Sequence, residues 1–261
     1  MKSLNFVLTV KGTNTYLVGR GPKRLLIDTG EGKPQWIKQL QDTLTSENAT
    51  IDKVVITHWH PDHIGGVKDL GALSSNPTVY KSQIVPSDNM EDIHDGQKFE
   101  VEGATLRAFH CPGHTEDHMA LILEEEDAMF TGDNVLGHGT AVFEDLSTYL
   151  NSLEKMGQQI NGRAYPAHGA VIEDSRARIK EYIDHRAMRQ REVIEVLGQQ
   201  HGEEGWEVMD IVKIIYKDVS ENLHFAASRG IFQILDKLLN EDKVHHDTDK
   251  DTWMLNKKAV L

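Results

Sequence analysis

The sequence predicts an α/β protein with a small α+β unit at its C-terminal end. Through the first 135 residues, short β-prone runs alternate with helix-periodic segments, and two amphipathic helices follow. A stretch rich in glycine and glutamate at 201–205 then breaks the pattern. Beyond it come two helical segments and two short strand-like runs, an order typical of winged-helix units. We therefore expect two domains, residues 1–200 and 201–261.

Local patterns predict the elements of the first domain in order. Thr15–Val18 and Arg24–Ile27 are β-prone runs on either side of a Gly-Arg-Gly-Pro turn, which predicts a hairpin. From Pro34 to Leu44, apolar residues recur at helical spacing behind a proline in the first turn. Lys53–Thr57 is a β-branched run typical of a buried strand. We expect further strands at Leu106–Phe109, Met119–Leu123 and Ala128–Phe130, and further helices at 145–157 and 175–197.

The second domain is predicted as two helices followed by a β-ribbon. Acidic side chains outnumber basic ones in it, which favours an interaction or structural role over duplex binding. Its expected elements are helices at Trp206–Tyr216 and Glu221–Leu239 and strands at Lys243–His246 and Thr252–Leu255. Its expected core consists of Trp206, Ile211, Ile215, Leu223 and Phe225.

Composition excludes several classes of protein. The 261 residues carry 28 basic and 41 acidic side chains, a net charge of −13, which argues against a general nucleic-acid binder. No run approaches 18 apolar residues, so no transmembrane helix and no membrane partner are expected, and the N-terminal residues do not resemble a signal peptide. The single cysteine, Cys111, excludes an intramolecular disulfide and suits a reducing compartment, so we expect a cytoplasmic protein.

The densest chemical signal lies directly after the predicted strand 53–57. His58, His60, Asp62 and His63 fall within six positions of the run Thr-His-Trp-His-Pro-Asp-His. The loop that leaves a rigid strand end can turn several side chains toward one point. Neutral imidazole and carboxylate are preferred ligands of Zn²⁺ and similar ions. The spacing therefore predicts a metal site rather than a surface histidine cluster.

Three later residues can complete a site with two metals. His114, Asp133 and His168 each lie in a turn or at a strand end, and each has glycine beside it, which permits close backbone approach. Each of the three alone is weak evidence for a metal ligand. Their order after the histidine cluster makes them strong evidence together.

With these motifs, the chain resembles the metallo-β-lactamase fold superfamily, whose pattern is Asp, His-x-His-x-Asp-His, His, Asp, His. The resemblance implies an αββα sandwich as the fold of the first domain. It also implies two divalent metal ions, Zn²⁺ or, as the alternative, Mn²⁺. Asp28 matches the first motif and would fix the histidine loop without binding metal. By this resemblance, His58, His60 and His114 would hold one metal, Asp62, His63 and His168 the other, and Asp133 would bridge them.

Further stretches resemble the beta-lactamase-like protein 2 group within that superfamily. They are residues 12–18, 103–107 and 135–140, and 210–216 with 221–224 in the second domain. Animal members of this group are single-strand endoribonucleases, whereas fungal members are thioesterases that release polyketides from the acyl carrier protein of a non-reducing synthase. Residues 47–50 and 129–150 look closer to the fungal branch, and His138 stands where animal members tend to carry glutamate.

The resemblance predicts a metal-dependent hydrolase that cleaves a thioester of an acyl carrier protein domain. Asp62 would orient the nucleophile and move its proton, and His138 would contact the substrate or assist the leaving group. The alternatives are an endoribonuclease acting on single-stranded RNA and a non-enzymatic protein with a relic site. We expect Trp59 to pack beneath the site rather than stack on substrate, and Cys111 to be a buried apolar residue. Arg178, Arg186 and Arg189 form either a solvated helix edge or a basic edge for an anionic partner.

Overall fold

The computed structural model describes residues 4–10, 12–73, 75–84, 89–199 and 205–256. The chain divides into two compact units, one of residues 1–144 and 148–182, the other of residues 145–147 and 183–261. The division falls inside the last long helix of the first domain. The expected boundary between residues 200 and 201 lies in a stretch outside the described residues and stays a prediction.

The first unit is built on two five-stranded sheets. The first sheet has the order β1 (Leu4–Val10), β2 (Thr13–Val18), β3 (Lys23–Ile27), β4 (Thr50–Ile56), β5 (Thr78–Lys81). The second has the order β10 (Ala164–Pro166), β9 (Ala128–Gly132), β8 (Met119–Leu123), β7 (Ala104–His110), β6 (Lys98–Val101). Strands β2 and β3 form the predicted hairpin, with Tyr16 opposite Ile27, and β3 and β4 are parallel.

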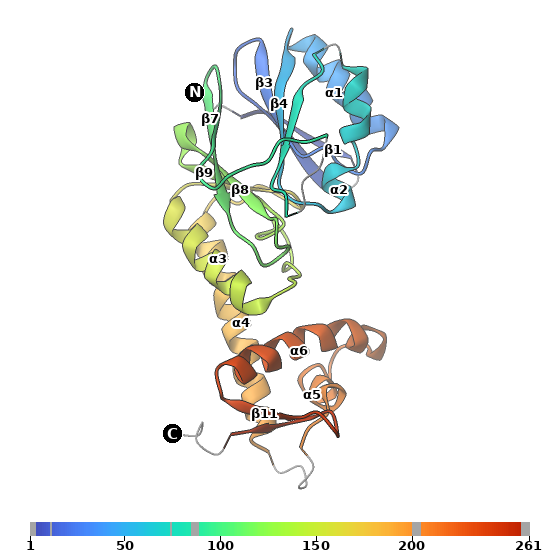
Figure 1. Ribbon diagram of the computed structural model, residues 1–261, viewed down its shortest axis with the longest axis vertical. Coiled ribbons are helices and arrows are strands. Elements are labelled where there is room, and N and C mark those ends of the chain that lie inside the picture. Colours follow the sequence, from blue (N-terminus) through green and yellow to red (C-terminus); the bar gives the residue numbers. More distant parts are fainter. Residues whose placement is uncertain (1–3, 11, 74, 85–88, 200–204, 257–261) are drawn as a thin grey trace. The chain divides into compact units, whose positions relative to one another are not determined.

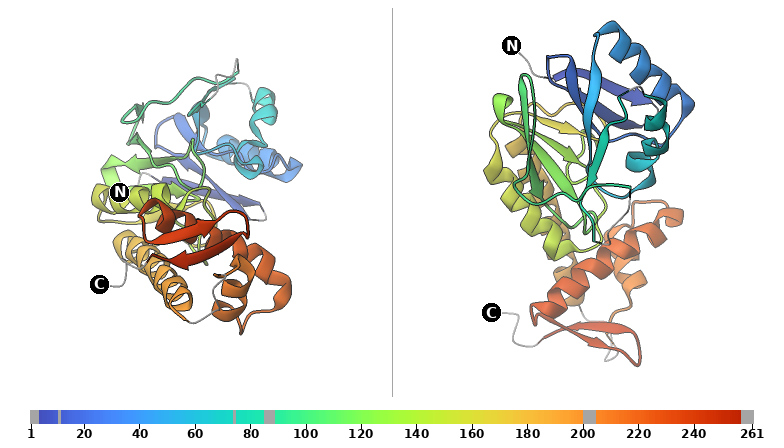
Figure 2. Two further views of the ribbon diagram at one scale, coloured as in Figure 1. Left: turned by 60° about the horizontal axis from the view of Figure 1, so that its bottom comes forward. Right: turned by 45° about the horizontal axis from the view of Figure 1, so that its top comes forward.

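A continuous apolar core lies between the two sheets. Tyr16, from the first sheet, contacts Phe130 and Tyr165 of the second with ring centroids 4.9 and 5.9 Å apart. Helix α1 (Pro34–Ser46) covers the outer face of the first sheet through Trp36 and Leu40, which are at most 1% exposed. Helix α3 (Leu146–Gln159) and the first turns of α4 (Ser175–Leu197) lie beside the second sheet (Figures 1 and 2). The helix–sheet–sheet–helix order confirms the predicted αββα fold.

Short 3-10 and α-helical segments fill the connections. They are α2 (Pro61–Ile64), η1 (Val67–Ala72) and η2 (Glu124–Glu126). Strand β3 is parallel to β4 in the first sheet, and β9 is parallel to β10 in the second. The loops that leave the carboxyl ends of β4, β9 and β10 meet, since the ligand atoms they carry lie close together. Every candidate ligand except His114 lies in one of these loops.

The second unit contains α5 (Val208–Ile215), η3 (Glu221–Leu223), α6 (His224–Asn240) and a ribbon of β11 (Val244–Asp247) and β12 (Thr252–Leu255). This order confirms the winged-helix prediction. The predicted core was wrong in part, because Leu223 and Phe225 are 52% and 85% exposed. Leu223 ends η3 and Phe225 lies in the first turn of α6, whose buried face instead carries Ile231, Ile234, Leu235 and Leu238. No helix among the described residues is long and apolar enough to cross a bilayer.

Candidate metal centre

Four separate loops bring the seven predicted ligands together. The loop after β4 carries His58 and His60, and the single turn of α2 begins at Pro61, so Asp62 and His63 turn toward the same space. His114 lies in the loop between β7 and β8. Asp133 and His168 follow the ends of β9 and β10. The structure thus gathers all seven into two adjoining groups.

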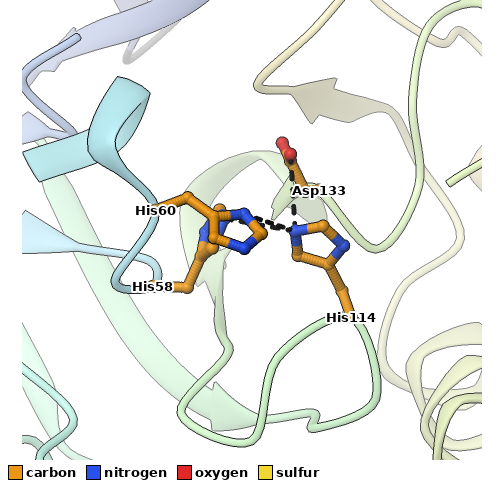
Figure 3. A group of neighbouring side chains, drawn as sticks. All are labelled: His58, His60, His114 and Asp133. Carbon is orange, nitrogen blue, oxygen red and sulfur yellow. Dashed lines mark hydrogen bonds and ion pairs between the residues drawn. The ribbon is translucent and has the colours of Figure 1, made fainter. Parts of the chain in front are cut away.

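The first group consists of His58, His60, His114 and Asp133 (Figure 3). His114 Nε2 lies 3.3 Å from His58 Nε2 and 3.0 Å from His60 Nδ1, and those two atoms are 3.0 Å apart. Asp133 Oδ2 lies 3.6 Å from His114 Nε2. The ligand atoms of the group all lie within 4.8 Å of one another.

The second group consists of Asp62, His63 and His168. His168 Nε2 lies 3.3 Å from Asp62 Oδ2 and 3.2 Å from Asp133 Oδ1, and His63 Nε2 lies 3.4 and 3.5 Å from the same two oxygens. The two oxygens of Asp133 therefore face different groups. This carboxylate thus lies between the histidines of both groups.

Hydrogen bonds behind the histidines fix which ring nitrogen faces the centre. His114 Nδ1 lies 2.7 Å from Val142 O, His168 Nδ1 lies 2.7 Å from Gly12 O, and His63 Nδ1 lies 2.8 Å from Asp28 Oδ2. Carbonyl and carboxylate oxygens only accept, so each Nδ1 carries the proton. A neutral ring then directs the lone pair of Nε2 inward. Metal-binding histidines are held by such outer acceptors.

The donor set fits divalent metal ions. His63 Nε2 and Asp133 Oδ1 are buried and have no hydrogen-bond partner among the described residues, although both face the shared space. Three imidazole nitrogens at 3.0–3.3 Å are too close to be stable unless protons or a cation lie between them. Nitrogen and carboxylate ligands suit Zn²⁺ and Mn²⁺. The cluster could therefore hold metal ions.

Without metal, protons balance the charges of the centre. Burial tends to raise the pKa of Asp62 and of Asp133, but the close contacts with His168 and His63 outweigh it and hold both pKa values well below their usual range. The same carboxylates raise the pKa of His168 to about 10. Burial lowers the pKa of His58 well below its usual value, and its histidine neighbours lower it further. A bound cation would replace the protons.

Asp28 lies behind the centre, as the resemblance implied. It accepts hydrogen bonds from Thr57 N at 2.8 Å, from the Thr57 hydroxyl and from His63. Its φ of 58° lies in the left-handed region, where Asp and Asn are tolerated better than most residues. Thr13, which we did not single out from the sequence, donates its hydroxyl to Asp62 Oδ2 at 3.0 Å.

Other residues from the sequence analysis lie outside both groups. His138 is exposed, and its ring edge lies beside the Gly169 backbone, next to His168 in the chain. The expectation for Trp59 was wrong, because its side chain is 46% exposed and meets His60 edge-on with centroids 4.5 Å apart. Proline at 61 and the start of α2 turn His60 inward and leave the preceding indole outside.

Cys111 is fully buried, as expected, and burial raises its pKa to about 12. A histidine that the sequence analysis overlooked, His118, lies 3.3 Å from its sulfur. On α4, Arg178 pairs with Glu181 and Arg189 with Glu192, both at 2.7 Å. These pairs favour the solvated edge over the basic edge.

Comparison with known proteins agrees with this fold and with the winged-helix unit of the chain. The model of the metallo-beta-lactamase superfamily matches residues 8–168, and that of the beta-lactamase associated winged helix domain matches residues 208–253. The Lactamase-like protein aptB of Emericella nidulans is 45% identical over 91% of this chain and 79% of its own length. The atrochrysone carboxyl ACP thioesterase of Aspergillus chevalieri is 46% identical over 90% of this chain and 78% of its own length.

Solved structures support the fold. A metallo-beta-lactamase family protein from Thermus thermophilus has a TM-score of 0.76 at 20% identity and covers 98% of this chain and 99% of its own. A beta-lactamase domain protein from Burkholderia ambifaria has a TM-score of 0.78 at 17% identity, with 94% of this chain and 87% of its own covered.

Proposed function

This chain belongs to the metallo-β-lactamase superfamily, and we propose that it is a metal-dependent thioesterase that releases a polyketide from an acyl carrier protein domain. The observation that carries the hydrolase part is the position of Asp133, whose two oxygens face two separate histidine groups. The carrier-protein thioester as substrate is supported by the relative from Aspergillus chevalieri that is named a thioesterase.

We propose that the two groups hold two divalent metal ions, Zn²⁺ or alternatively Mn²⁺. His58, His60 and His114 would hold one, Asp62, His63 and His168 the other, and Asp133 would contact both. The metals would supply Lewis acidity at the thioester carbonyl and favour hydroxide over water as the nucleophile. The protein would supply the direction of attack and the binding of the acyl group.

Asp62 is suited to orient the attacking water. Its contacts with Thr13, His63 and His168 fall on Oδ2, so Oδ1 is available to accept a hydrogen bond from that water. The leaving thiolate is stable near neutral pH because a free thiol has a pKa of about 8.5, so no strong general acid is required. His138 can then serve as a substrate contact beside His168.

Trp59 is suited to bind the acyl group. It is an exposed aromatic side chain in contact with His60, so a planar acyl group bound at the first histidine group would cover it. Val142 lies behind His114 and is 70% exposed. Burying these apolar surfaces would favour an aromatic polyketide over a short acyl chain.

The test is hydrolysis of an aryl thioester by metal-loaded protein, assayed beside cleavage of a labelled single-stranded RNA. Asp62→Asn keeps the shape of the side chain and removes its charge, and Asp42→Asn makes the same change on the exposed face of α1. We expect thioester turnover that Asp62→Asn reduces at least about 100-fold and Asp42→Asn leaves unchanged.

Two outcomes would overturn the proposal. RNA cleavage with the same sensitivity to Asp62→Asn, without thioester turnover, would assign the endoribonuclease activity instead. Metal-loaded protein that hydrolyses neither an aryl thioester nor an acyl group on an isolated carrier domain would remove the thioesterase proposal and leave the metal centre in place.

A further inference from the structure

We propose that His118 is a positioning residue that aims Asp133 into the centre. The inference rests on the proposed role of Asp133 as a metal ligand. His118 belongs to neither ligand group, is fully buried, and directly precedes β8. Its Nε2 accepts a hydrogen bond from the backbone N–H of Asp133 at 3.1 Å.

This hydrogen bond determines the tautomer of His118. A backbone N–H can only donate, so Nε2 must be unprotonated and Nδ1 must carry the hydrogen of the neutral ring. Cys111 Sγ lies 3.3 Å from Nδ1 and is the acceptor for that hydrogen. Asn134 Nδ2 lies 3.2 Å from Nδ1, but it is a donor and cannot accept this hydrogen. It donates instead to Cys111 O at 2.7 Å. Cys111 therefore holds the ring in the tautomer that Asp133 needs.

The backbone around Asp133 is shaped to meet this ring. Gly132 has φ 51°, and a Cβ at that position would lie 2.5 Å from His118 Nε2. Only glycine lets the chain leave β9 in a left-handed conformation directly against the imidazole. On the other side of Asp133, the Tyr149 hydroxyl donates to Asn134 O at 2.6 Å. The amide of Asp133 is thus fixed, while its carboxylate faces His114 and His168.

His118 also connects two of the ligand loops. The N–H of Cys111 donates to His118 O at 3.0 Å, and this pair closes the loop that carries His114. The side chain of His118 reaches the turn that carries Asp133. His118 thus links the loop that carries His114 to the turn that carries Asp133.

The test compares His118→Gln with His118→Asn. The amide of glutamine extends to the position of Nε2 and can still accept from Asp133 N–H, whereas the amide of asparagine ends near Nδ1. We expect His118→Asn to weaken Zn²⁺ binding about 10- to 100-fold and His118→Gln to stay within about threefold of the unchanged protein. Competition with a chromophoric chelator measures the affinity, and the visible spectrum of the Co²⁺-loaded protein reports ligand geometry.

His224→Gln and His224→Asn are the matched controls, because His224 is a buried histidine of the second unit that donates to Tyr216 O and Val219 O. If both His118 variants fail to fold, Cys111→Ser and Cys111→Ala replace them. Serine keeps an acceptor for Nδ1–H and alanine removes it, so weaker metal binding is expected for alanine alone.

Equal Zn²⁺ affinities and Co²⁺ spectra for folded His118→Gln, His118→Asn and the unchanged protein would overturn the inference. If the Cys111 variants are used instead, equal Zn²⁺ affinities for Cys111→Ser and Cys111→Ala would overturn it. Metal affinity does not depend on the substrate. An inactive protein in which only His118→Asn loses metal would therefore refute the thioesterase while supporting this inference.

Discussion

Replacing Asp28 by asparagine should selectively weaken the ligand group that contains His63. Asparagine has the same shape and tolerates the φ of 58°, so the backbone is preserved. Its oxygen can still accept from Thr57 N, and the Thr57 hydroxyl can rotate to meet the new NH₂ group. The bond to His63 Nδ1–H, 2.8 Å long, is lost because two donors would face each other.

His63 then has two ways to respond, and both reduce metal binding. If it keeps its tautomer, a buried N–H remains unpaired, at a cost of about 1–3 kcal/mol. If it moves the proton to Nε2, it blocks the atom that faces Asp62 and Asp133. We expect affinity at this group to fall about 10- to 100-fold, equivalent to about 1.4–2.8 kcal/mol, while the group of His58 keeps its affinity.

Titration of metal-free protein with Zn²⁺ against a chromophoric chelator measures both affinities. Asp127→Asn is the matched control, since Asp127 also has a positive φ of 47° and accepts a side-chain hydrogen bond, from Asn161, at the β8–β9 turn. The reasoning is refuted if Asp28→Asn binds two equivalents with both affinities within about threefold of the control.

Three further predictions concern other residues of the first unit. Cys111, whose pKa burial raises to about 12, should not react with a thiol reagent at pH 8 until urea unfolds the protein. Burial and the Glu126 carboxylate raise the pKa of Tyr165 from 10.0 to about 12. Folding therefore favours the protonated phenol, and this stabilisation is complete below pH 10 and lost as pH rises from 10 to 12. Urea unfolding should show that the free energy of unfolding falls less between pH 8 and pH 11 for Tyr165→Phe than for the unchanged protein. An equal fall in both proteins would contradict the assignment. Trp59→Ala should raise KM for an aromatic acyl thioester about 10-fold, with less effect for an acetyl thioester and little effect for Trp59→Phe, and equal changes for both substrates would exclude Trp59 from acyl binding.

Local sequence patterns predicted most of the regular structure. The limits of α4 and of β8 and β12 agree with the prediction, because their apolar periodicity ends at clear breaks. Strands β1, β5, β6 and β10 were missed. β5, β6 and β10 have only three or four residues and are defined by their pairing with neighbouring strands. β1 could have been found from its β-prone run, which pairs with β2 from Leu4 to Val10.

The ligands of the candidate centre could be predicted for a different reason. Histidine and aspartate at close spacing are uncommon outside metal sites, so His58, His60, Asp62 and His63 carry their signal in one short stretch. The residues that hold the ligands have no such signature. Val142 and Gly12 act through backbone carbonyls, which every residue possesses. A sequence cannot distinguish these two positions from any other loop residue.

His118 shows where this distinction matters most. By type and spacing it resembles a ligand, since it follows His114 by four positions, yet both of its nitrogens are engaged behind Asp133. His118 differs from the candidate ligands in its position. Its ring is fully buried under the turn after β9, whereas the candidate ligands lie where the loops come together. Only the pairing of β8 with β9 places it there, through a contact between residues fifteen apart. Short motifs thus identify the candidate ligands, whereas the packing of the two sheets determines how their side chains are oriented.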